Sequence, residues 1–273
     1  MRYFNYGNYL EDNEKFNEQI ARIYELESEL VEKNPEPQSD LFIKSSIATI
    51  LMEGMKLDKE RAFQIGNPDF DLDENYSSMT RPEKEFLGYL DVLKTIEESY
   101  EYIGIRPNII LQLHRDMYQF INAELGGNYR NACIYVNEVK EDGSFVPYFE
   151  PLEAHETMNN LQVLCEHYDT LEFDRDHALI AAIMFLLDFY LIHPFNFGNG
   201  EALRFMTRLM FLKNGLHVFS KISLEEMMLE DDKAFLEAVR DSAIGHVEGD
   251  NDYTAFVAYM LDLIEEAYKR ALN

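Results

Sequence analysis

The strongest constraint on this chain is a helix, loop and helix pattern around residue 193. An apolar run from Ala178 to Ile192 leads into the glycine-rich loop HPFNFGNG at residues 193–200, and a run with a helical pattern follows the loop. Gly198 and Gly200 permit backbone conformations with positive φ, and they lie just before a helix whose first N–H groups lack partners. The sequence therefore predicts a tight connection between two helices, with free N–H groups at the start of the second.

The residue types in this loop suit an anion site beside a proton acceptor. Free N–H groups at a helix N-terminus bind phosphate well, and His193 can accept a proton near neutral pH. Together they favour activation of a hydroxyl next to a phosphorylated donor. A tight turn in which His193 caps the first helix explains the same residues without any ligand, so the loop alone leaves both interpretations open.

The string HPFNFGNGEALR at residues 193–204 resembles the signature of Fic (Fido) domain proteins. That signature reads HPF, any residue, Asp or Glu, GNGR, two residues and Arg. Such proteins typically transfer AMP from ATP to a hydroxyl of another protein. The resemblance implies that His193 is the general base and that Arg204 contacts the terminal phosphate. It also implies that the loop backbone, with the residues Gly198, Asn199 and Gly200, holds the donor phosphates.

Two positions depart from this signature. Phe197 stands where the family has the acidic residue that holds Mg²⁺, and a phenyl ring offers no oxygen to a hard cation. Its neighbour Asn196 is only a weak substitute, so ATP with Mg²⁺ is expected without the usual ligand, and no other metal site is visible. Glu201 replaces the arginine that clamps the inner phosphates. A carboxylate about 4 Å from a phosphate is repelled by roughly 1–4 kcal/mol, depending on screening.

Glu201 also has a simpler explanation, because a carboxylate in the first turn of a helix is favoured by the helix dipole. The sequence is therefore consistent with two alternatives, in which the phosphate site is either retained or lost. Arg208 lies one turn after Arg204 and leaves two alternatives as well. It either adds positive charge to a nucleotide site or pairs with a nearby carboxylate.

The residues before this loop predict a β-hairpin. Two β-type runs at 134–136 and 145–147 flank a polar turn around Asp142-Gly143. The tracts LHRD and GGNYR upstream also resemble their counterparts in Fic domains, although His114 in the first is expected to be structural. In the family this hairpin is a flap that holds the target protein by strand addition. A surface hairpin without function is the alternative.

A second site is expected near the N-terminus, where SSIATILMEG at residues 45–54 reads as a helix that closes at Gly54. Thr49 and Glu53 are four residues apart and share one face of this helix. The segment resembles the inhibitory motif of the family, whose glutamate pairs with the second arginine of the loop signature and blocks the terminal phosphate. The resemblance places Glu53 against Arg204; an ordinary solvated glutamate is the alternative.

Composition narrows the classes of partner. The chain of 273 residues carries a net charge of −27, which argues against binding to nucleic acid or to an anionic membrane surface. The apolar run is shorter than the roughly 20 residues that cross a bilayer, and the N-terminus shows no signal-peptide pattern. Cys133 and Cys165 read as free thiols. A cytoplasmic protein is expected.

The predicted fold is mainly α: a Fic-type helical bundle with a small β-hairpin flap and an N-terminal helical extension. Residues 1–82 are predicted as an N-terminal helical region, with the inhibitory helix at about 41–54, and residues 83–273 as the Fic-like domain. A stripe at spacings of three and four runs from Phe16 to Leu30 and predicts a helix, whereas residues 63–82 are expected to form a loop.

Two classes of function follow. The first is a Fic-type protein adenylyltransferase, autoinhibited by the N-terminal helix and weakened by Phe197 and Glu201. The second is a catalytically inactive Fic-like module that binds a partner or small ligand. A variant of the first uses a different phosphorylated donor. The expected partner is a hydroxyl of a target protein that docks on the hairpin. Fic-like proteins often form dimers, so a homodimer is also open, although no interface is visible.

Overall fold

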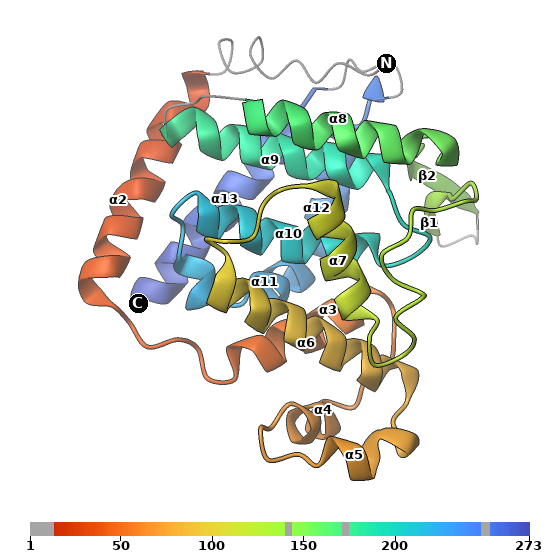
Figure 1. Ribbon diagram of the computed structural model, residues 1–273. Coiled ribbons are helices and arrows are strands. Elements are labelled where there is room, and N and C mark those ends of the chain that lie inside the picture. The colour runs from red at the N-terminus through yellow and green to blue at the C-terminus, as the bar shows by residue number, and fades with distance from the viewer. Residues whose placement is uncertain (1–13, 140–143, 171–174, 247–251) are drawn as a thin grey trace.

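The protein is described by a computed structural model that covers residues 14–139, 144–170, 175–246 and 252–273. The described chain is mainly helical and carries one two-stranded sheet, which confirms the predicted fold class (Figure 1). The N-terminal residues before Glu14 and the predicted hairpin turn around Asp142-Gly143 lie outside the described residues.

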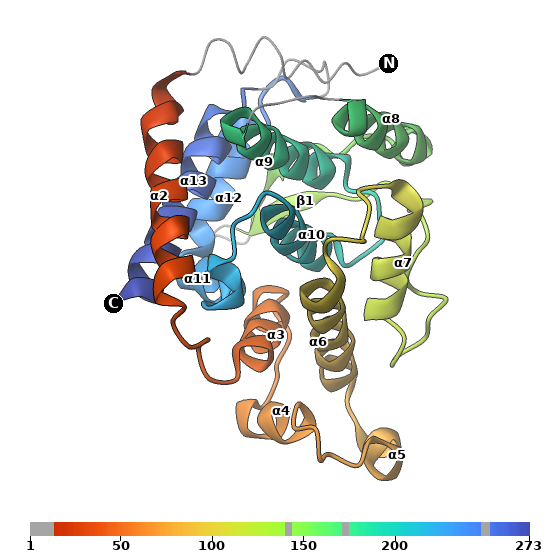
Figure 2. The same ribbon diagram turned by 60° about the vertical axis from the view of Figure 1, so that its left-hand side comes forward.

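Two helices on either side of the glycine-rich loop form the centre of the molecule. They are α9 (Arg175–Ile192) and α10 (Asn199–Lys213), and they pack against each other. From Leu179 onward α9 is buried and apolar except for Asp188, which accepts the hydroxyl of Tyr253 at 2.9 Å, as expected of a helix inside a core. Figure 2 shows α10 enclosed between α9 and α6 (Arg81–Ser99). The loop at residues 193–198 is therefore anchored at both ends by buried helices.

The helices before residue 83 pack directly on helices from the rest of the chain. The helix α2 (Asn17–Lys33) lies along α13 (Thr254–Leu272). The helix α3 (Leu41–Met52) packs between α6 and α11 (Leu224–Glu230). The predicted stripe in the first of these helices is confirmed, because its residues face the core (Phe16, Ile20, Ile23, Leu30).

The loop predicted for residues 63–82 is wrong. The helix α4 (Lys59–Ile65) reaches into it, and the short helix α5 (Leu72–Asn75) lies within it. Each begins at an aspartate whose side chain accepts a backbone N–H, Asp58 for α4 and Asp71 for α5. Aspartate is among the best N-cap residues, so these caps start helices in a stretch whose glycine and proline content suggested a loop.

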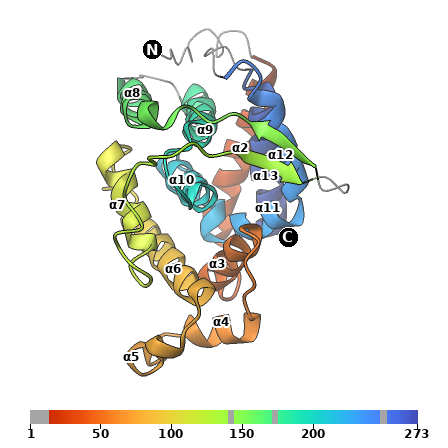
Figure 3. The ribbon, with the colours of Figure 1, turned by 90° about the vertical axis from the view of Figure 1, so that its right-hand side faces the viewer.

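The predicted hairpin is present, but only Val136 of the predicted first run, 134–136, belongs to its first strand. Strands β1 (Val136–Val139) and β2 (Phe145–Phe149) are antiparallel, and Figure 3 shows them beside α12 (Asp232–Ser242). The helices α7 (Pro107–Met117) and α8 (Thr157–Thr170) precede and follow the hairpin. Both cysteines are free thiols. Among the described residues, no helix is both long and apolar enough to cross a membrane.

A buried carboxylate joins three parts of the chain. Glu27 of α2 is only 4% exposed, and it accepts hydrogen bonds from the backbone N–H of His217 at 2.9 Å and from the hydroxyl of Tyr268 at 2.5 Å. The Nδ1 atom of His217 lies 2.8 Å from the same carboxylate. This contact raises the pKa of His217, because the hydrogen bond to Glu27 favours the charged ring.

The contact between Glu27 and His217 predicts a loss of stability on the alkaline side. The pKa of His217 is raised in the folded state, so its contribution is complete below about pH 6.5 and disappears as the pH rises through the folded-state pKa. Thermal unfolding between pH 6 and 8.5 should show this decline, and His217→Gln should flatten it. Parallel profiles for the two proteins would contradict the assignment.

Candidate functional site

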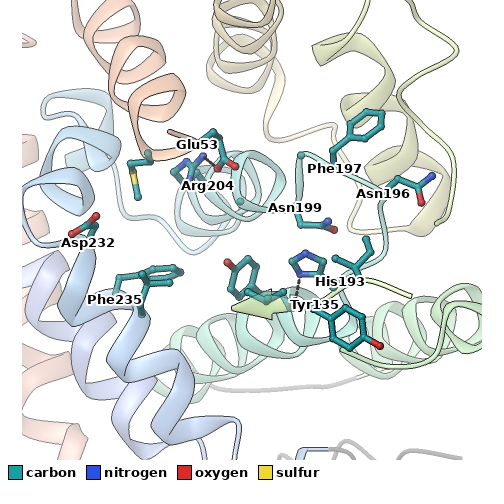
Figure 4. A pocket seen from close by; sticks show the side chains of 16 residues that line it. Glu53, Tyr135, His193, Asn196, Phe197, Asn199, Arg204, Asp232 and Phe235 are labelled. Atoms are coloured by element: carbon teal, nitrogen blue, oxygen red, sulfur yellow. Dashed lines mark hydrogen bonds and ion pairs between the residues drawn. The ribbon is translucent and has the colours of Figure 1, made fainter. Parts of the chain in front are cut away.

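A cavity of about 410 Å³ opens at the glycine-rich loop. Figure 4 shows His193, Asn199, Arg204 and Glu53 around this space, with Glu53 and Arg204 pointing toward one another. The walls come from the end of α3, the approach to β1, the loop itself and α12. The lining residues are Met52, Glu53, Ile134, Tyr135, Val136, Tyr190, His193, Asn196, Phe197, Gly198, Asn199, Gly200, Arg204, Asp232, Phe235 and Leu236.

His193 reaches the cavity in the form that accepts a proton. It follows the last residue of α9 with a positive φ of 51°, and its Nδ1 lies 3.2 Å from the carbonyl oxygen of Tyr190. We infer from this contact that Nδ1 carries the proton and that Nε2 keeps its lone pair. Burial lowers the pKa of His193 to about 4, so the ring is neutral at pH 7.

Arg130 holds the backbone around His193 in place. Its Nε donates to the carbonyl oxygen of His193 at 2.7 Å, and its backbone N–H donates to that of Pro194 at 2.8 Å. The remaining guanidinium nitrogens donate to the carbonyl oxygens of Ala132 and Leu152. Sequence reasoning noticed Arg130 only within the GGNYR tract and gave it no role. Its partners at His193 and Pro194 lie more than 60 residues along the chain, so no spacing pattern could reveal them.

His114 supports the loop from α7, as a structural residue. Its Nδ1 accepts the N–H of Gly127 at 2.9 Å, and its Nε2 donates to the carbonyl oxygen of Phe197 at 3.1 Å. The ring stacks on Phe195, with 3.7 Å between the ring centroids. Burial lowers the pKa of His114 to about 4, so the neutral ring keeps one donor and one acceptor. The expectation of a structural histidine is confirmed.

The loop requires glycine at residue 198. Gly198 caps α10 with a φ of 78°, and a Cβ there would lie 2.7 Å from the hydroxyl of Tyr118 and 2.9 Å from Nε2 of His114. The side chain of Asn199 folds back on the same loop. Its oxygen accepts the N–H of Phe195 at 3.0 Å, and its nitrogen donates to the carbonyl oxygen of Phe195 at 2.9 Å. Asn199 therefore offers a ligand its backbone N–H, while its amide closes the turn.

A carboxylate occupies the start of α10. Glu53 follows the last residue of α3, and Gly54 continues with a positive φ of 71°, as predicted for its position after the helix. Oε1 of Glu53 lies 2.6 Å from Nη2 of Arg204, and the hydroxyl of Thr49 accepts from Nε of Arg204 at 3.0 Å. A Cβ on Gly200 would lie 2.4 Å from the same carboxylate oxygen. The expected contact between Glu53 and Arg204 is thus present, and the Glu53 side chain is paired while it stays 29% exposed.

Two other charged residues of α10, Glu201 and Arg208, do not line the cavity. Arg208 is fully buried, its Nη1 lies 3.0 Å from Glu97, and its guanidinium covers the ring of Phe42. Of the two alternatives for Arg208, pairing with a carboxylate is the correct one. Glu201 is 4% exposed and is not among the residues that line the cavity.

The residues around the cavity do not fit a protein-held Mg²⁺. Phe197 lines it and packs edge-on against Tyr118, with 5.2 Å between ring centroids. The carboxylates in the lining are Glu53, already paired with Arg204, and Asp232. Within the described ranges, no group of three or more His, Cys, Asp or Glu residues could hold a metal ion. Free N–H groups at the start of α10 and Arg204 suit a phosphate instead.

Comparison with known proteins agrees with this geometry. Residues 104–211 match the model of the Fic/DOC family. A Fic family protein from Desulfovibrio desulfuricans is 18% identical with a TM-score of 0.68, covering 93% of this chain and 74% of its own. Fic-1 from C. elegans is 17% identical with a TM-score of 0.66, and the match covers 93% of this chain and 71% of Fic-1. A Fic domain-containing signaling protein from Bacteroides thetaiotaomicron is 15% identical with a TM-score of 0.64, covering 93% and 95%. These likenesses show a shared fold, and no curated protein matches the sequence.

Proposed function

Because residues 104–211 match the model of the Fic/DOC family, we propose that this protein transfers AMP from ATP to a hydroxyl of another protein, and that Glu53 holds the reaction off. One observation carries the proposal. A neutral His193 and Arg204, which lies in the second turn of α10, face the same cavity. A proton acceptor beside an anion site is the combination that group transfer from a nucleotide needs.

In this reaction, Nε2 of His193 takes the proton from the acceptor hydroxyl. The oxygen then bonds to the α-phosphorus of ATP, the bond from that phosphorus to its bridging oxygen breaks, and pyrophosphate leaves. The backbone N–H groups of residues 198–200 and the guanidinium of Arg204 hold the phosphates. The low pKa of His193 keeps its ring in the accepting form, and a bound polyphosphate raises this pKa toward neutral through its negative charge.

Glu53 prevents this arrangement by occupying the phosphate position. Its carboxylate contacts both Arg204 and the start of α10 at Gly200. A phosphate about 4 Å away would be repelled by roughly 4 kcal/mol at an effective dielectric constant near 20, which lowers the affinity about a thousandfold. The protein would therefore become active only after the Glu53 side chain leaves Arg204.

The hairpin is the proposed docking place for the acceptor protein. Its approach segment, residues 134–136, lines the same cavity as His193, and a two-stranded sheet has a free edge on each strand. An extended segment of the partner added to such an edge pairs its backbone with the hairpin. This would carry an acceptor hydroxyl past the cavity.

The phenyl ring of Phe197 favours a second candidate function. Because it leaves the cavity without the carboxylate that a family member uses for Mg²⁺, the protein would bind a nucleotide or partner without transferring anything. A rise of the melting temperature with ATP is expected for both candidates, since any ligand of the folded state stabilises it. Only the first candidate predicts an AMP adduct.

The intact mass of Glu53→Gly after incubation with ATP and Mg²⁺ tests the transfer. We expect added AMP on the protein, or on proteins of an extract supplied with labelled ATP. The matched variant Glu53→Gly with His193→Ala should be at least about 100-fold slower, the usual loss when a general base is removed. If Glu53→Gly binds ATP and yet labels nothing in a His193-dependent way, the transferase proposal is wrong and the binding module is favoured.

A further inference from the structure

A second buried carboxyl lies on the same helix as Arg204, besides Glu53 at the end of α3. Glu201 lies three residues earlier on α10, and residues at this spacing share a helix face. Both Glu53 and Glu201 raise the pKa of Arg204 by favouring its charged form. The side chains of Glu201 and Arg204 are buried, with exposures of 4% and 3%. Yet Oε2 of Glu201 has no hydrogen-bond partner in the part of the chain that the structure describes.

The neutral form of Glu201 is favoured while Glu53 is paired with the arginine, because the carboxyl is buried and its Oε2 has no partner among the described residues. Burial raises the pKa of Glu201 most, and the negative charge of Glu53 raises it further, whereas Arg204 and the backbone N–H of Glu201 lower it. A neutral carboxyl needs no counter-ion, which explains how it stands beside a pair that is already balanced. The titratable and charged groups that act on Glu201 or feel its charge are Glu53, Glu85, Tyr118, Tyr190 and Arg204.

We propose that Glu201 is a second internal counter-ion of Arg204, which replaces Glu53 when the Glu53 side chain leaves the arginine. A buried guanidinium with no counter-ion is strongly unfavourable, so some negative charge must stay beside Arg204. Once Glu53 is gone, its repulsion no longer acts on Glu201, while the attraction of Arg204 does. Glu201 then ionises and releases one proton to the solvent.

A second counter-ion changes how the site is regulated. The part of this proposal that concerns ATP rests on the proposed function, and the rest does not. Displacing Glu53 does not leave Arg204 free for a phosphate, because the arginine then pairs with the carboxylate of Glu201 on its own helix. A phosphate that binds there must compete with Glu201 or return a proton to it. Binding of a negatively charged ligand at Arg204 is therefore opposed twice, by Glu53 at the end of α3 and by Glu201 on α10.

Thermal unfolding of single and double variants tests this without any ligand. In the natural protein, Glu201→Gln replaces a neutral carboxyl by a neutral amide of similar shape, and we expect almost no change in melting temperature. In a Glu53→Gln background the same substitution removes the last counter-ion of Arg204, and we expect a fall of at least about 5 °C. Equal shifts in the two backgrounds would overturn the proposal.

Glu85→Gln is the matched control for this cycle. Glu85 is a buried carboxyl whose pKa is also raised, chiefly by burial, but it pairs with Arg81 rather than Arg204. The charge of Glu53 is the smallest of the effects on the pKa of Glu85, so this substitution should shift the melting temperature nearly equally with Glu53 or Gln at residue 53. A background-dependent shift as large as that of Glu201→Gln would show a general effect of the acidic cluster and would overturn the specific role.

Calorimetry with ATP adds a readout that a merely structural residue would not move. We expect Glu53→Gly with Glu201→Gln to bind ATP at least about tenfold tighter than Glu53→Gly alone. Binding to Glu53→Gly should take up close to one proton, measured in buffers of different ionisation enthalpy, and the double variant should take up none. Equal affinities and proton uptake would overturn the proposal. None of these experiments measures AMP transfer, so a failure of the transferase proposal can be distinguished from a failure of the counter-ion proposal. If no variant binds ATP, the thermal unfolding of the variants decides the counter-ion proposal.

Discussion

The Gly88→Ala variant is expected to lose about 3 kcal/mol of stability, the upper end of the usual cost of overpacking a core. Gly88 lies at the buried crossing of α6 and α7. A Cβ built on it would lie 1.8 Å from the carbonyl oxygen of Met117 and 2.7 Å from its carbonyl carbon. Both atoms belong to the backbone, so no rotamer change relieves the clash, and the two helices must separate.

This separation would also reach the glycine-rich loop. The residue after Met117 is Tyr118, whose hydroxyl lies against Gly198, and His114 on the same helix holds the carbonyl oxygen of Phe197. Moving α7 therefore withdraws the support beneath the loop.

Urea unfolding measures the effect of Gly88→Ala, and Gly104→Ala provides the matched control. A Cβ on Gly104 would meet nothing closer than 3.8 Å, and its nearest neighbours are side-chain atoms of Arg106. We expect this control to stay within about 0.5 kcal/mol of the natural protein. Similar losses for both variants would show that the helix crossing tolerates a methyl group.

Acidification is expected to destabilise the protein through its two buried loop histidines, His114 and His193. Burial lowers the pKa of each to about 4, below the value of about 6.5 that a histidine has in an unfolded chain. The unfolded chain thus binds more protons between these values. The stability from the neutral rings is complete above about pH 6.5 and is lost as the pH falls toward 4. Each histidine should cost about 1–3 kcal/mol at pH 4 relative to pH 7.

The free energy of unfolding at pH 7.5, 6.5, 5.5 and 4.5 checks this result. The variant His114→Gln has no charge at any of these pH values, so its stability should fall less steeply than that of the natural protein over the same range. Carboxylates that titrate in this range are common to both proteins and cancel in the comparison. If the two profiles have the same slope, burial of a neutral His114 is not a source of the acid sensitivity.

Several features of the fold could be predicted because their causes are local. The run ahead of His193 is apolar except for Asp188 and therefore forms a buried helix, and two glycines mark the turn that follows it. The hairpin formed as expected, although the run 145–147 pairs with residues 137–139 and not with the predicted run 134–136. The error at residues 63–82 arose from local signals that compete, because the caps Asp58 and Asp71 outweighed the nearby glycine and prolines.

The contact between Glu53 and Arg204 was predictable only by resemblance to a family motif. The two residues are 151 positions apart, and no periodicity connects them. Composition and spacing placed Glu53 near the end of a helix. Only the resemblance to the inhibitory motif of Fic proteins identified Arg204 as its partner.

The sequence by itself determined the class of fold and the glycine-rich loop, because these depend on neighbouring residues and on helical or strand periodicity. Only the tertiary structure decided what the polar side chains do. Arg130 holds the backbone at His193, Arg208 pairs with Glu97, and Glu201 turns into the interior beside Arg204. The physical reason is that burial and the charges of distant segments set the partner and the protonation state of each group, and neither exists until the helices pack.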